Sequence, residues 1–118
     1  MNLEAGDYLI FQVESGYGLM RILAIETNEQ AERIWHISTF EDLFLDVEFA
    51  EMALENPSSL KTSAPHLALT NRAFESTQVA KMSNVPLEPE DLTGFNEWQL
   101  NPNREVIDRS VRLMLGLR

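Results

Sequence analysis

Cysteine is missing from this chain of 118 residues. Its absence excludes disulfide bonds, zinc sites with thiolate ligands, CxxC redox motifs and cysteine nucleophiles. A chain without cysteine is typical of a reducing compartment, and we therefore expect the protein in the cytoplasm.

Basic residues are scarce relative to acidic ones. The chain carries 9 Lys and Arg against 19 Asp and Glu, which gives a formal net charge of −10 at pH 7. Nucleic acids and anionic membranes are bound by surfaces with a positive electrostatic field. The charge balance therefore argues against a general nucleic-acid-binding or membrane-binding role.

Long apolar runs are also lacking. The longest uninterrupted runs contain three or four residues, whereas a membrane helix requires roughly 20. Residues 1–7 include acidic side chains where a signal peptide requires basic ones. We expect a soluble protein with no membrane partner.

The composition favours one folded domain over residues 1–118. A hydrophobic content of 44% is too high for a disordered chain. β-branched, aromatic and other apolar residues predict three strands at 8–13, 19–26 and 34–39. Gly16 and Gly18 suit a tight turn between the first two strands, so residues 7–39 are predicted to form an antiparallel meander.

Residues 40–118 are predicted to be mainly helical, with a short strand near 66–70. A helix is expected at 41–55, because Ser38 and Thr39 are favourable N-caps and acidic residues follow them. This segment carries a second apolar row, which either packs on another element or stays exposed: Leu45, Phe49 and Met52.

Two further helices are indicated by capping signals. Thr70 is predicted to cap a helix at 71–81, after a loop at 56–65. Pro89 suits the first position of a short helix that ends at Asn101. Leu92, Phe95 and Trp98 form the apolar stripe of that helix.

The segment 104–117 carries two conflicting patterns. A helix would form two correctly ordered acid–base pairs four residues apart, Glu105–Arg109 and Asp108–Arg112. A strand would explain the alternation of apolar residues over 111–117. The ion pairs favour the helix. The whole pattern predicts the α+β class, with an N-terminal meander of three or more strands packed against helices.

No catalytic, metal-binding or cofactor-binding residue is predicted. His36 and His66 lack the spacing of a zinc motif, and Glu48, Glu51 and Glu55 are best explained as a solvated helix face. The glycines of residues 14–18 match no phosphate-binding or nucleophile motif. An alternative class remains open: a small-ligand-binding or hydrolytic enzyme in which His36 or His66 works with a carboxylate brought close by folding.

Acidic charge is concentrated in the first half of the chain. Residues 1–60 contain 12 acids and 2 bases, whereas residues 61–118 contain 7 of each. Residues 41–51 mix acids with large apolar side chains and contain no base. Charge of this kind also keeps proteins soluble, but its combination with apolar anchors is typical of a surface that binds a basic protein.

We therefore expect a non-enzymatic protein-binding module, with an inhibitor or immunity-type role as one version. The candidate partner-binding residues are Asp46, Glu48, Phe49, Glu51 and Trp98. A homo-oligomeric structural protein is the remaining alternative, in which the second apolar row of 41–55 packs against another copy.

Overall fold

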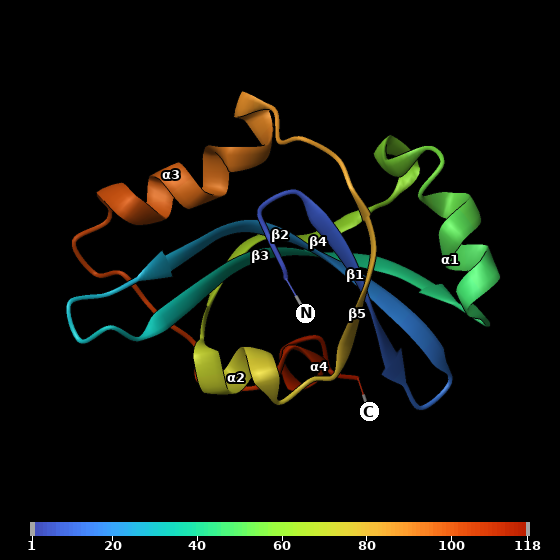
Figure 1. The fold of residues 1–118 in the computed structure, drawn as a ribbon, viewed down its shortest axis with the longest axis horizontal. Coiled ribbons are helices and arrows are strands. Elements are labelled where there is room, and N and C mark those ends of the chain that lie inside the picture. The colour runs from blue at the N-terminus through green and yellow to red at the C-terminus, as the bar shows by residue number, and fades with distance from the viewer. Residues whose placement is uncertain (1, 118) are drawn as a thin grey trace.

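The computed structural model describes residues 2–117 and contains a five-stranded antiparallel sheet with the strand order β4-β3-β2-β1-β5 (Figure 1). This arrangement confirms the predicted α+β class. The strands are β1 (Asp7–Val13), β2 (Gly16–Thr27), β3 (Arg33–Phe44), β4 (Thr62–Thr70) and β5 (Val79–Asn84).

The predicted meander is confirmed as β1, β2 and β3. A two-residue turn at Glu14 and Ser15 joins β1 to β2, and Gly16 pairs with Val13 where the hairpin starts. Gly18 lies against the ring of Phe11, so a Cβ added there would approach that ring to 2.7 Å. Glycine is required at position 18 because any Cβ there would clash with the Phe11 ring.

Helices cover both faces of the sheet. We call the face under α1 (Val47–Ala53) and α3 (Thr93–Leu100) the upper face, and the face under α2 (Asn71–Glu75) and α4 (Val111–Met114) the lower face (Figure 1). Two 3-10 turns complete the upper side, η1 (Pro57–Ser59) and η2 (Pro89–Leu92). Within residues 2–117, no helix is long and apolar enough to cross a membrane.

Each face of the sheet has its own apolar core. On the lower face, Trp35 stacks on Phe74 with ring centroids 3.9 Å apart, and the Trp35 indole donates a hydrogen bond to Asn71. On the upper face, Tyr8, Ile10 and Phe40 pack near Ala50 of α1. Strand β1 contributes to both cores, as its apolar residues on alternate sides require.

The predicted helix at 41–55 is wrong over its first part. Residues 40–44 extend β3 instead, and Leu43 and Phe44 pair with the start of β2. The helix begins only at Val47, with Asp46 as N-cap accepting from the Phe49 N–H at 3.0 Å. Pairing with β2 provides hydrogen bonds for the backbone N–H and C=O groups of this segment, so a helix is not needed to satisfy them.

The predicted helix at 71–81 is also too long. Thr70 is its N-cap, as expected, but the helix ends at Glu75. Residues 79–84 form β5, which pairs with the otherwise free edge of β1. The predicted loop at 56–65 is shorter too, because β4 already begins at Thr62.

Neither pattern seen in 104–117 extends over the whole segment. Its helical part is α4, only four residues long, and Ile107 forms a parallel bridge to Leu69 on β4. Asp108 pairs with Arg72 of α2 rather than with Arg112. The prediction of a helix from the i,i+4 pairs was therefore wrong, because Asp108 pairs with Arg72, a residue distant in sequence.

Candidate functional site

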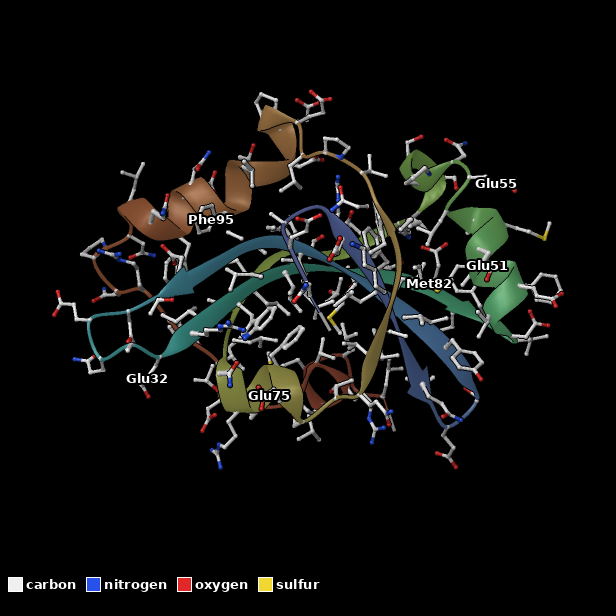
Figure 2. The ribbon with its side chains drawn as sticks, viewed as in Figure 1. Glu32, Glu51, Glu55, Glu75, Met82 and Phe95 are labelled. Atoms are coloured by element: carbon white, nitrogen blue, oxygen red, sulfur yellow. The ribbon has the colours of Figure 1, made fainter. Side chains whose placement is uncertain are left out.

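The first candidate site is an acidic–apolar surface at the end of the sheet that carries α1. We define it by the exposed apolar side chains Leu45, Phe49 and Met52 and the exposed acids Asp46, Glu48, Glu51 and Glu55. Leu45 is 81% exposed and Met52 is 62% exposed, unusually high values for large apolar groups. Figure 2 shows Glu51 and Glu55 at this end of the molecule.

The local sequence of α1 explains why these side chains are exposed. Val47, Ala50 and Leu54 lie on the helix side that packs against the upper core. Phe49 and Met52, three residues apart, share the other side. The second apolar row noted in the sequence is thus an exposed strip, and Phe49 is half exposed.

The acids of this surface are not neutralised by bases of the same chain. Among residues 2–117, Glu48, Glu51 and Glu55 form no ion pair, and the nearest basic residue in sequence, Lys61, pairs with Glu41. The carboxylate of Asp46 caps the N-terminus of α1 by accepting from the Phe49 N–H. The surface therefore presents uncompensated negative charge beside apolar groups.

Trp98 lies elsewhere, although the sequence grouped it with the α1 residues. It belongs to α3, toward the opposite end of the long axis (Figure 1). Its indole N–H donates to the Glu105 carbonyl at 2.8 Å, and the Arg104 guanidinium lies 5.7 Å from its ring. The structure thus brings Asp46, Glu48, Phe49 and Glu51 together and separates Trp98 from them.

The second candidate site is a histidine cluster beneath α3. Nε2 of His36 lies 2.5 Å from Oε1 of Glu26, and Nδ1 of His36 lies 2.9 Å from Nε2 of His66. The three residues come from the neighbouring strands β2, β3 and β4, and they share the upper face. Sequence reasoning did not find this cluster, because the positions are diagonal rather than directly paired in the strand register.

Burial controls the protonation of the cluster. His36 is completely buried, and burial lowers its pKa below the ordinary value although the Glu26 carboxylate opposes the shift. Burial and the neighbouring His36 lower the pKa of His66 to about 4, again against the effect of Glu26. Both imidazoles are therefore neutral at pH 7.

The neutral cluster has one consistent arrangement of protons. His36 donates from Nε2 to Glu26, because the carboxylate can only accept. Nδ1 of His36 then carries a lone pair, and His66 donates to it from Nε2. The carboxylate thus fixes the tautomer of both rings.

The cluster meets only part of what an enzyme site requires. A histidine does lie within hydrogen-bond reach of an acid, as the enzyme alternative demands. However, His36 is 0% exposed, which leaves no room for a reacting atom beside it. Among residues 2–117, no group of three or more His, Cys, Asp or Glu side chains lies together so as to hold a metal ion.

A third feature is a cavity of about 390 Å³ between η1, η2 and the sheet. Arg21 lies in its lining and is 7% exposed. Its guanidinium donates to the Val85 carbonyl at 2.7 Å, pairs with Asp91 at 3.3 Å and lies over the Tyr8 ring. Arg21 therefore ties the connection between β5 and η2 to the sheet, and neither histidine lines this cavity.

Comparisons of the chain with models of known protein families, with curated proteins and with solved structures found no match. Function is therefore inferred from the acidic–apolar surface, the histidine cluster and the Arg21 cavity. Of these three, the acidic–apolar surface is the most open to another molecule.

Proposed function

We propose that the protein is a non-enzymatic protein-binding module whose acidic–apolar surface binds a basic protein. One observation carries the proposal. Of the seven large apolar side chains exposed within residues 2–117, three lie on or next to α1: Leu45, Phe49 and Met52. Contiguous exposed apolar groups with a polar rim are typical of protein interaction sites.

Charge defines the chemistry of the partner. Glu48, Glu51 and Glu55 lie beside these apolar groups without a base of the same chain paired to them within residues 2–117. A partner with Lys and Arg around an apolar centre would complement this surface, since opposite charge steers association and apolar anchors supply affinity. An inhibitor or immunity-type role fits such a partner, because it would cover a basic functional surface of another protein.

Co-purification from the source cells tests the proposal. The tagged protein is expected to retain a stoichiometric basic protein, and the double variant Phe49→Glu/Met52→Glu is expected to lose it. The matched control is Leu100→Glu/Leu113→Glu, which adds the same charge at two other exposed apolar positions. Circular dichroism and thermal unfolding establish that each variant is folded.

Two outcomes would overturn the proposal. The first is equal recovery of the same protein with the wild type and with the Phe49/Met52 variant. The second is a wild-type protein that retains only further copies of itself. Size-exclusion chromatography with light scattering detects the second outcome, and it would assign the exposed strip of α1 to self-association.

A further inference from the structure

Helix α3 lies over the histidine cluster and contacts it mainly through two aromatic residues. The Phe95 ring lies 4.5 Å from the His36 ring, and the Trp98 ring lies 4.7 Å from it in an edge-to-face arrangement. The same two rings lie 6.1 and 5.8 Å from His66. Figure 2 shows Phe95 on α3 above the sheet.

Close approach of the backbone adds to this contact. A Cβ added to Gly94 would lie 2.8 Å from the Cβ of His66. The helix backbone at Gly94 therefore packs directly on His66, with no space for a side chain between them. Farther along, Asp91 of η2 is tied to Arg21, and Trp98 is tied to the Glu105 carbonyl.

The contact between the two imidazole rings depends on the number of protons that they carry. With both rings neutral, one proton occupies the contact between Nδ1 of His36 and Nε2 of His66, which are 2.9 Å apart. One extra proton is tolerated, because an imidazolium can donate to a neutral neighbour. Two extra protons place N–H groups on both facing nitrogens, so the contact becomes repulsive in charge and in geometry.

We propose that residues 89–100, comprising η2 and α3, form a pH-gated lid that leaves the sheet when His36 and His66 are both protonated. His66 is the ring that must move, since it is half-buried while His36 is fully buried and held by Glu26. Its movement pushes against Gly94 and disrupts the aromatic packing. An open lid uncovers the histidine cluster and one wall of the Arg21 cavity.

The charges around the cluster support a response to acid. Glu26 on β2 is the only carboxylate bonded to the pair within residues 2–117, and it can neutralise one imidazolium but not two. From the lid side, Arg104 lies against Trp98, and Asp91 is already paired with Arg21. Glu97 of α3 is exposed.

The low pKa of His66, about 4 in the closed structure, sets the range in which the lid responds. In an open lid His66 would titrate near its ordinary value of 6.5. The open form therefore binds protons more readily than the closed form between these two values. By linkage, the ratio of open to closed lid rises as the pH falls through this range.

Hydrogen exchange of the full chain tests the lid. After correction for the intrinsic exchange rate at each pH, the protection of α3 amides should fall by about tenfold or more between pH 7.5 and 4.5. The amides of β1, β2 and β3 serve as the internal reference, and their protection should fall by a smaller factor than that of α3, because it follows only the global stability. Global acid unfolding would instead lower the protection of α3 and the strands together.

His66→Gln is the matched variant, because the amide keeps an N–H donor toward His36 but cannot take up a second proton. Its α3 protection should not change over the same pH range. His66→Phe, which keeps an aromatic ring under α3, provides a second variant if His66→Gln folds poorly. Constant α3 protection in the wild type, or the same pH-dependent loss in a folded variant, would overturn the proposal.

A second measurement does not depend on substitution. Nitrogen-15 shifts of the wild-type imidazoles at pH 7.5 should show a proton on Nε2 of both rings, with Nδ1 of both unprotonated. A His66 ring that titrates near pH 6.5 without any change in α3 would also contradict the gated lid.

Discussion

His66 provides the sharpest single-residue link between structure and solution behaviour. It is a neutral ring at pH 7, held between the buried His36 and the aromatic side chains of α3. Burial lowers its pKa to about 4, so the folded protein resists its protonation while the unfolded chain does not. Stability must therefore depend on pH in a predictable direction.

We predict that the free energy of unfolding falls as the pH decreases from about 6.5 toward 4. In this range the unfolded chain binds more protons than the folded protein, because the His66 pKa is lower in the fold. Above about pH 6.5 the stabilising contribution of His66 is fully present, so the free energy of unfolding should no longer change with pH because of this residue. Urea unfolding at pH 4.5, 5.5, 6.5 and 7.5 measures this free energy of unfolding.

The fully buried Asp7 does not contribute to the stability change in this range. Burial alone would raise the pKa of Asp7, but hydrogen bonds from Asn84, the Glu4 N–H and Lys81 together lower it. Such an acid loses its stabilising effect only as the pH falls below its ordinary value of 3.8. His66→Gln should reduce the slope of the stability curve between pH 5 and 6.5, and the slope that remains belongs to His36, whose pKa burial also lowers. An unchanged slope in this variant would contradict the assignment.

At the scale of helices and strands, the elements that depend on neighbouring residues could be predicted from the sequence. The three meander strands, the Thr70 N-cap and the break at residues 56–57 were predictable, because β-propensity, capping and proline act within a few residues. Strand β5 was not predictable. Its residues have weak β-propensity, and their pairing depends on the free edge of β1, which is distant in sequence.

The two candidate sites differ in the same respect, since one is local in the sequence and the other is assembled from distant residues. The acidic–apolar surface lies within residues 45–55, so the local composition indicated it. The histidine cluster joins residues from three strands, and it depends on a diagonal register that one-residue slips would destroy. Glu26 carried no signal of its own, since it is one of 19 acids in the chain.

Gly94 gives a prediction at the scale of the α3 helix. Ala has a higher helix propensity than Gly by about 1 kcal/mol, so Gly94→Ala would stabilise α3 if propensity decided the outcome. The new Cβ, however, would lie 2.8 Å from the Cβ of His66. We therefore expect Gly94→Ala to lower the thermal midpoint and to increase hydrogen exchange in α3.

Asn96→Ala is the control for that experiment, because Asn96 is exposed on the same helix. It should leave the thermal midpoint unchanged or raise it slightly. If Gly94→Ala stabilised the protein as much as Asn96→Ala, the close packing of α3 on His66 would be refuted.

The whole molecule is polarised in charge, and the fold explains how. Several acids of residues 1–60 are engaged within the fold, including Asp7 with Lys81 and Glu26 with His36. Those of α1 face outward at one end of the long axis, whereas α3 and the histidine cluster lie toward the other (Figure 1). The surface proposed to bind a partner and the lid proposed to respond to acid therefore lie at opposite ends of the molecule.

The association rate constant of the co-purified basic partner is the most direct test of the proposed function. Glu48→Lys/Glu51→Lys/Glu55→Lys reverses the charge of the acidic–apolar surface and leaves the Asp46 cap intact. Glu14→Lys/Glu29→Lys/Glu97→Lys, three exposed acids elsewhere, gives the same net charge and serves as the control. At low salt we predict an association rate at least about tenfold slower for the first variant than for the control. Its rate should also depend less on ionic strength. Equal rates for the two variants would contradict binding through this surface.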